Sequence, residues 1–132
     1  MFTLWAIARS PLILGGNLTK LDDFTRELIT NKAVIAVNQT AWASHPVTAL
    51  PPGFDNLRVW LAEAGPRRKP KTYLAIFNLD DRPTAAQALW SHLGLSAHKH
   101  AVRDLWTGAR NKYAKALDIT LPPHGSAIYR VY

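Results

Sequence analysis

Two pairs of neighbouring carboxylates are the first candidates for chemistry in this sequence. Asp80 and Asp81 stand in "NLDDRPT", and Asp22 and Asp23 stand in "KLDDFT". Paired carboxylates can serve general acid and base catalysis. Neighbours on a strand, however, point to opposite faces, and the Asn, Asp and Pro residues around the first pair are typical of a turn. We therefore predict turn chemistry for the first pair and helix capping for the second.

Histidine side chains are the next candidates. His98 and His100 can share one face of a strand, and His92 is nearby in the sequence. Two histidines can bind a metal ion, but no third ligand stands at a suitable spacing. His124 in "PPHG" indicates a turn between two strands. The chain has no cysteine, so it has no disulfide framework and no thiolate nucleophile. We assign no catalytic, cofactor-binding or metal-binding residue and expect no cofactor.

Aromatic and basic residues could serve binding. A sugar-binding module exposes aromatic rings on one face, whereas a small sandwich buries them. We expect three of the five tryptophans in the core: Trp60, Trp90 and Trp106. Residues 1–57 hold four Lys or Arg and four Asp or Glu, while residues 58–132 hold twelve and five. The densest run, "RRKPK" at 67–71, predicts a solvated hairpin tip, and because no nucleic-acid motif accompanies it we expect no nucleic-acid partner.

The elements that must position these residues change in kind along the chain. Residues 2–8 form an apolar, helix-like run, and residues 12–14 form a short apolar strand that stops at two glycines. A helical period follows at Leu21, Phe24, Leu28 and Ile29. Asn31 suits a left-handed C-terminal position of this helix. The run "KAVIAVNQ" fits either a last helical turn or a strand.

Beyond residue 57 the pattern changes to strands. The segment 41–57 contains three prolines and a glycine without a sustained period, which indicates a linker. Six short runs rich in branched and aromatic residues follow, at 58–63, 72–79, 86–90, 100–106, 114–121 and 126–132. In the fifth run, Leu117, Ile119 and Leu121 alternate with polar residues, so we expect them to be buried together. The spacing predicts an antiparallel β-sandwich over 58–132.

The first forty residues do not make a domain by themselves. A single strand between two helices leaves its backbone groups without partners, so residues 1–40 read as the end of a larger α/β fold. The N-terminal apolar run has no basic region before it and is too short to span a bilayer. We expect a soluble chain without a membrane partner, and the sequence assigns no compartment.

Several motifs in order resemble one family. "LWAIARSPLILGGNL", "ELITNKAVIAVNQ", "YLAIFNLDD", "VRDLWTG" and "LPPHGSAIYRV" together resemble the C-terminal third of glycoside hydrolase family 27, the α-galactosidases and α-N-acetylgalactosaminidases. The resemblance implies a mainly β chain, with the last helix-strand-helix piece of a (β/α)8 barrel at 1–40, a linker at 41–57 and a sandwich at 58–132. The family often has an acidic residue where this chain has Asn17, and commonly Asp where it has Thr40.

The resemblance also implies a function for the parent protein. The family uses two aspartates, a nucleophile and an acid/base, on barrel strands that do not occur in residues 1–132. The implied parent, secreted or periplasmic, hydrolyses terminal α-galactosides, and the implied partner of this chain is its N-terminal catalytic barrel. The alternative is a stand-alone carbohydrate-binding module, which requires two Trp or Tyr rings exposed on one face. Without a barrel, we expect residues 1–40 to self-associate, and deletion of them to give a better-behaved monomer.

Overall fold

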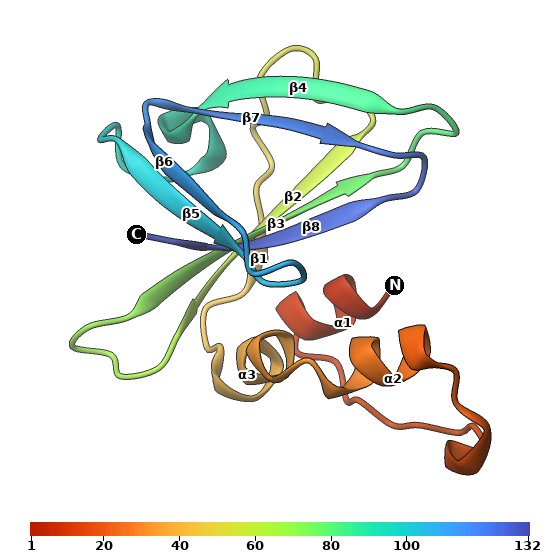
Figure 1. The fold of residues 1–132 in the computed structure, drawn as a ribbon. Helices are drawn as coiled ribbons and strands as arrows, with labels where there is room; N and C mark the ends of the chain where they lie inside the picture. The colour runs from red at the N-terminus through yellow and green to blue at the C-terminus, as the bar shows by residue number, and fades with distance from the viewer.

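The computed structural model describes all residues, 1–132, and arranges them in three layers (Figure 1). A two-stranded sheet lies at the top of the view, a six-stranded sheet in the middle and three helices at the bottom. The elements are α1 (Phe2–Ile7), η1 (Leu18–Lys20), α2 (Asp23–Thr30), α3 (Lys32–Thr40), β1 (His45–Pro46), β2 (Leu57–Ala64), β3 (Lys71–Asn78), β4 (Thr84–Leu89), η2 (Trp90–Leu93), β5 (His100–Asp104), β6 (Arg110–Ala114), β7 (Ala116–Leu121) and β8 (Ser126–Val131).

The two sheets are antiparallel. The large sheet has the order β1-β2-β3-β8-β5-β6, and the small sheet pairs β4 with β7. β8, the last strand along the sequence, therefore lies between β3 and β5, where Ala75 pairs with Ile128 and Arg103 pairs with Arg130. Each of the other inner strands of the large sheet is therefore hydrogen-bonded to β8 or belongs to the β2–β3 hairpin.

The sandwich core fills the space between the two sheets. Leu117, Ile119 and Leu121 on β7 are all buried there, which confirms the expectation from their alternation. Opposite them lie the inward side chains of the large sheet, among them Leu57, Val59, Leu61, Leu74 and Ile76. The prediction of a mainly β chain with an antiparallel sandwich is confirmed.

The helices cover the outer face of the large sheet. Phe2 and Ile7 on α1 and Val34 and Val37 on α3 are buried against side chains of β2, β3 and β8. The sheet presents Ala62, Ala64, Ala75, Tyr73 and Ile128 to them. Because both faces are covered, β2 and β3 are apolar almost throughout, while β7 shows a one-sided alternation.

The helical part differs from the sequence prediction at two points and decides one alternative that the sequence left open. Residues 12–14 form no strand, because no other strand of the chain lies beside them to accept their hydrogen bonds. The run from Lys32 to Thr40 is the helix α3. Asn31 is not left-handed, because it is the N-cap of α3 and its Oδ1 accepts from the N–H groups of Ala33 and Val34.

The strand pattern missed two edge strands. β6 has no buried residue, so its sequence carries no apolar alternation. β1 is two residues long and lies within the segment 41–57, where it pairs with Leu61 and Trp60 of β2. None of the helices is long and apolar enough to cross a membrane.

Candidate functional site

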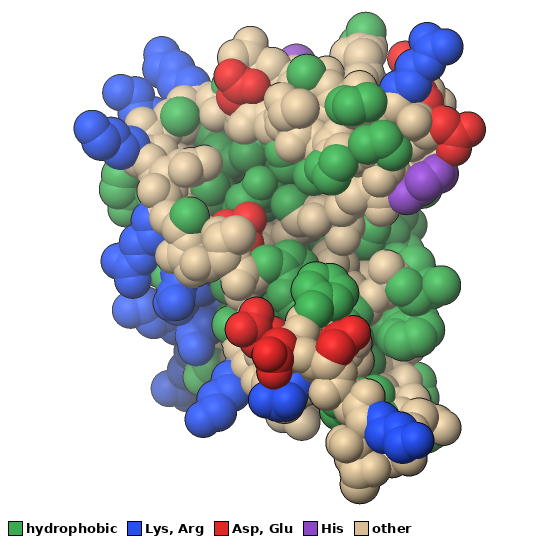
Figure 2. Space-filling view, turned by 45° about the vertical axis from the view of Figure 1, so that its right-hand side comes forward, with side chains coloured by type: hydrophobic (Ala, Val, Ile, Leu, Met, Phe, Trp, Pro, Cys, Tyr) green, Lys and Arg blue, Asp and Glu red, His purple; other side chains and the backbone are tan.

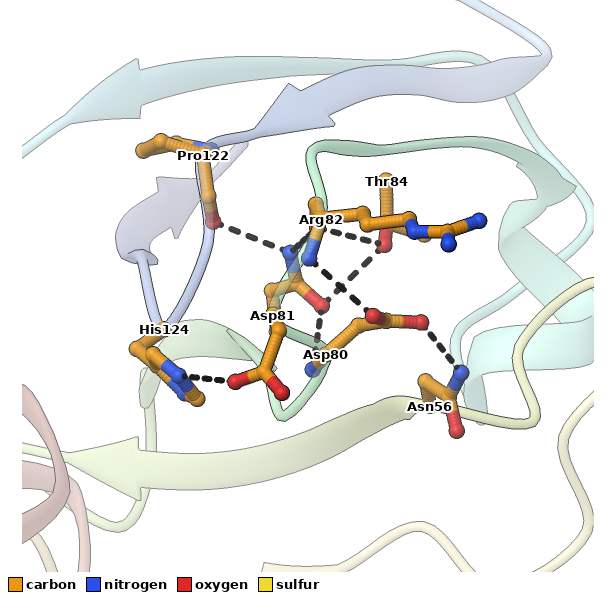
Figure 3. A network of polar contacts seen from close by, with 8 residues as sticks. Asn56, Asp80, Asp81, Arg82, Thr84, Pro122 and His124 are labelled. Carbon is orange, nitrogen blue, oxygen red and sulfur yellow. Dashed lines mark hydrogen bonds and ion pairs between the residues drawn. The ribbon is translucent and has the colours of Figure 1, made fainter.

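Asp80 and Asp81 belong to a polar corner at one end of the sandwich (Figure 3). Oδ2 of Asp80 accepts from Nδ2 of Asn56 at 2.6 Å, and its Oδ1 accepts from the N–H of Arg82 at 3.0 Å. Oδ1 of Asp81 lies 2.8 Å from Nε2 of His124. The two carboxylates therefore have different partners and do not converge on a common point, so this geometry is that of a turn, as expected.

Asn78 holds this corner together, and the sequence did not single it out. Its side chain is buried, and its Nδ2 donates to the carbonyl oxygens of Arg82 at 2.8 Å and Pro122 at 2.9 Å. Its Oδ1 accepts from the N–H of Asp80 and from Oγ1 of Thr84 (Figure 3). One amide thus joins the loop after β3 to the loop after β7. An Asn directly before a turn was the only signal for this role.

The "PPHG" turn has the tight geometry that its composition indicates. His124 has a φ of 52°, in the left-handed region. A Cβ on the next residue, Gly125, would lie 2.7 Å from ring atoms of Pro122, so glycine is required there. His124 and Asp81 are both exposed, so their ion pair contributes little to stability.

The histidines near β5 have separate environments. His100 contacts Oγ of Ser96 through Nε2 at 3.0 Å and the carbonyl of Tyr132 through Nδ1 at 3.2 Å. Its ring packs edge-on against Trp90. His92 and His98 are exposed, and no group of three or more His, Asp or Glu side chains in the chain is arranged to hold a metal ion.

Trp60, Trp90 and Trp106 pack in or against the two cores and do not form an exposed aromatic face. Trp90 is buried and its Nε1 donates to the carbonyl of Ala114 at 2.7 Å, as expected for a core residue. Trp60 and Trp106 are half-buried against the helix-covered core. Trp106 donates from Nε1 to Oγ1 of Thr3 and contacts Phe2 edge-on, which ties the β5–β6 turn to α1.

The outer side of the helical layer is apolar and uncovered. Its large exposed side chains are Leu4, Trp5, Ile13, Leu14, Leu18 and Phe24. The exposed fraction is 85% for Ile13 and 72% for Phe24, which is high for such side chains. We call these six residues the apolar patch. Monomeric soluble proteins seldom leave this many large apolar side chains exposed together.

A second surface is basic and lies at the end of the large sheet where β3 begins and β8 ends. One hollow of about 350 Å³ is lined by Lys69, Lys71, His100, Arg130 and Tyr132, among others. A second, of about 190 Å³, is lined by Arg110, Tyr113 and Tyr132 with Ala101, Val102 and Asn111. We call these two hollows, which share Tyr132, the basic groove. Lys and Arg side chains crowd the side of the molecule on which the C terminus lies (Figures 1 and 2).

Three side chains have shifted pKa values. The N–H of Thr25 donates to Asp22 at 2.6 Å and holds the pKa of this helix-capping carboxylate below its usual range. Burial raises the pKa of Tyr73, and the charge of Arg130 partly opposes this. Burial, with a smaller contribution from Asp104, raises the pKa of Tyr129 to about 12. None of the three is a catalytic acid or base near neutral pH.

Comparison with known families matches nearly the whole chain. The profile of the alpha galactosidase C-terminal beta sandwich domain matches residues 54–131, and the profile described as alpha galactosidase A matches residues 1–40. The division between the two profiles coincides with the change from helices to strands.

Individual relatives agree with these profiles. Alpha-galactosidase 2 of Arabidopsis thaliana is 32% identical over 97% of this chain. The structure of a β-L-arabinopyranosidase of glycoside hydrolase family 27 from Geobacillus stearothermophilus has a TM-score of 0.85 and 29% identity over 99% of this chain, which covers 28% of that protein. Alpha-galactosidase I of Mortierella vinacea has a TM-score of 0.81 and 25% identity over 98% of this chain, which covers 34% of that protein. The chain spans about a third of the length of its relatives (32% of the Arabidopsis protein).

Proposed function

Because the chain belongs to the family of alpha-galactosidase C-terminal β-sandwich domains, within glycoside hydrolase family 27, we propose that it is the non-catalytic end of a retaining α-galactosidase-like glycosidase. In this proposal residues 1–40 complete a catalytic (β/α)8 barrel, residues 41–57 connect, and residues 58–132 form an accessory sandwich. The complete enzyme hydrolyses terminal α-galactosides.

One observation carries this proposal: the helices and the sandwich share a core. Ala6, Ile7, Val34 and Val37 of the helices are fully buried against the outer face of the large sheet. Polar contacts reinforce the junction, because Oγ1 of Thr3 lies 2.9 Å from Oγ of Ser126 and Nδ2 of Asn31 donates to the carbonyl of Leu105. A barrel end built into the sandwich in this way would hold the accessory domain in a fixed position.

The apolar patch supports the position of the catalytic part. It lies on the helices rather than on the sandwich, and the extended residues 12–14 have unpaired backbone groups within it. In an enzyme of this family, these are the groups that neighbouring barrel strands and helices would cover. The same feature accounts for an extended segment that pairs with nothing in the chain.

Activity assays on two proteins test the proposal. The 132-residue chain alone should not hydrolyse p-nitrophenyl α-galactoside. A chimera in which it replaces the matched 130 residues of Arabidopsis alpha-galactosidase 2 should hydrolyse it, and the same relative truncated before those residues should not. Turnover by the chain alone that is lost in Asp80→Asn with Asp81→Asn would overturn the proposal, as would a folded chimera without activity.

We further propose that the isolated chain self-associates through the apolar patch. Trp5→Ser with Phe24→Ser should shift sedimentation toward monomer, because both side chains are exposed. Deletion of residues 1–40, the variant that the sequence suggests, is a poor test because it would uncover Ala75 and Ile128, which are fully buried. A monomeric wild-type chain at high concentration would contradict the proposal.

A carbohydrate-binding role for the chain itself is a second candidate. One observation favours it: the exposed rings of Tyr113 and Tyr132 line the same hollow of the basic groove. A sandwich that binds sugar would hold the enzyme near a polymeric substrate. Titration with neutral galactan, followed by tyrosine and tryptophan fluorescence, tests the general form of this role. A flat response would remove the neutral-sugar version.

A further inference from the structure

We propose that the basic groove binds an acidic polysaccharide and that it recognises the sugar carboxylates. The preference for a carbohydrate over other polyanions rests on the proposed function. The recognition chemistry rests on the charges, hydrogen-bonding groups and rings of the groove itself.

None of the Lys and Arg side chains that line the groove forms an ion pair within the chain. Neither hollow is lined by an Asp or Glu side chain. The only ion pair between a Lys or Arg and a carboxylate in the chain joins Arg26 to Asp23, which lie on α2. Lys69, Lys71, Arg110 and Arg130 therefore leave a positive field in the groove that attracts an anion.

Three arginines lie on neighbouring strands of the large sheet. Arg103 and Arg130 are directly paired across β5 and β8, and Arg110 pairs with Arg103 from β6. Of the two that line the groove, Arg130 is held in place, with its Cζ 4.4 Å from the centre of the Tyr132 ring. A fixed planar guanidinium suits the two oxygens of a carboxylate.

The rings and the size of the groove fit a sugar chain better than a single ion. The larger hollow, about 350 Å³, falls within the range of organic ligand sites. Tyr132 separates it from the second hollow, where Tyr113 is 65% exposed. Exposed tyrosine rings can pack against the apolar face of a pyranose, while the cations on both sides of Tyr132 contact the carboxylates of successive sugars.

Nucleic acid is the less favoured polyanion. Binding of a single strand uses several free aromatic faces on which successive bases stack. The groove offers two exposed rings, those of Tyr113 and Tyr132, which are fewer than such a strand uses. Beside the groove, Arg67 of the β2–β3 turn lies over the ring of Trp42, so that ring is occupied.

Binding measurements on the full 132-residue chain test the proposal with three probes. Sodium polygalacturonate supplies a carboxylate on each sugar, neutral galactan supplies sugars without charge, and single-stranded DNA supplies phosphates. At about 50 mM salt we expect polygalacturonate to bind at least about tenfold more tightly than either other probe, and we expect salt to weaken this binding. Equal or tighter binding of DNA or galactan, or no binding of polygalacturonate, would overturn the proposal.

Two variants locate the site. Arg110→Gln with Arg130→Gln should weaken binding at least about tenfold, because hydrogen bonds to charged groups are lost. Because Arg130 is partly buried, Lys69→Gln with Lys71→Gln gives a second variant whose side chains are exposed. Arg58→Gln with Arg82→Gln removes the same charge at the opposite end of the large sheet, and it should change affinity less than about threefold. Equal losses of affinity in the groove variants and in the control variant would show that binding reflects general charge attraction, and they would overturn the proposed site.

The outcome of the polygalacturonate-binding test can be distinguished from the outcome of the chimera activity test. An active chimera that does not bind polygalacturonate would leave the glycosidase assignment intact and remove the groove. A chain that binds polygalacturonate through Arg110 and Arg130, in an inactive but folded chimera, would keep the groove and remove the glycosidase assignment.

Discussion

The two cores on opposite faces of the large sheet are built in different ways. The sandwich core has fifteen buried residues, all from positions 54–131, and both of its walls belong to the same β domain. The helix-covered core has twelve, and half of them come from residues 2–41. Its outer side, the apolar patch, is open. The sandwich core therefore has both walls within one domain, whereas the helix-covered core is the junction between the helices and the large sheet.

Polar contacts between distant residues also hold the junction between the helices and the large sheet. Thr3 bonds to Ser126, Asn31 bonds to Leu105, and Nδ2 of Asn38 donates to the carbonyls of Trp5 and Ser10. The sandwich has a long-range polar contact of its own, because the Asn78 amide joins the loops after β3 and β7. At the junction, the bonds of Thr3 and Asn31 join the helices to the sandwich, and those of Asn38 join parts of the helical layer to one another.

The largest effect is expected from a charge in the sandwich core. Ile119→Asp places an unpaired carboxylate among buried apolar side chains and should cost at least about 4 kcal/mol, enough to unfold the chain. Thr120→Asp on the same strand is the matched control, because Thr120 is exposed. Circular dichroism and thermal melting measure both. A cooperatively folded Ile119→Asp protein would show that the sandwich core is not the main source of stability.

The same change in the other core should have a more local effect. Ile7→Asp should cost about 3 kcal/mol and release the helices while the sandwich stays folded. Limited proteolysis should then cut within residues 1–40, and the tertiary signal of Trp90 should persist. Leu4→Asp, at an exposed position of the same helix, is the control. Loss of the whole fold in Ile7→Asp would mean that the two cores form one cooperative unit.

At the polar corner, Asn78→Ala should cost about 2–3 kcal/mol, because several buried polar groups lose their partner. Urea denaturation measures the change in the free energy of unfolding. Asn56→Ala removes one exposed hydrogen bond of the same corner and should cost much less. If the two variants behave alike, Asn78 does not close the sandwich.

At the junction, Asn31→Ala should cost about 1–2 kcal/mol, since it removes the cap of α3 and the bond to Leu105. Hydrogen exchange of the α3 amides should rise while that of β3 amides stays unchanged. Asn17→Ala, which removes a cap from the exposed η1, provides the comparison. Faster exchange throughout β3 would contradict a local role for Asn31.

The effect that is smallest near neutral pH compares one tyrosine from each core as the pH is raised. Tyr129 has a folded-state pKa of about 12, above its ordinary value near 10, so its neutral form is favoured by folding. The stability is present below about pH 10 and is lost as the pH rises toward 12. Tyr129→Phe should flatten this loss. Tyr73→Phe should flatten it less, because Arg130 opposes the effect of burial there. If stability falls with pH equally steeply in both variants, the two tyrosines do not differ in this respect.

The sandwich could be predicted from the sequence because β7 and its neighbours alternate. Leu117, Ile119 and Leu121 face one core, and their polar neighbours face solvent, so the period of two survives. The order of the strands could not be predicted, because no local pattern shows that β8 inserts between β3 and β5. β6 was missed because a fully exposed edge strand has no apolar period.

The candidate surfaces were less accessible to sequence reasoning. The turn role of Asp80 and Asp81 followed from their neighbours, but the role of Asn78 depends on carbonyls more than forty residues away. Likewise, the run at 67–71 was visible as charge, whereas Arg110 and Arg130 are brought near it by strand pairing across three strands. The packing of the helices against the large sheet could be recognised only from the three-dimensional fold.

The central position of β8 has a consequence for protein synthesis. Neither β3 nor β5 has its partner on that side until Ser126–Val131 have emerged from the ribosome, so the large sheet cannot close before then. Until then, the β2–β3 hairpin has no strand paired with the free edge of β3. A premature stop codon at position 126 would remove β8 together with Tyr132, and it would therefore be as harmful as one placed much earlier.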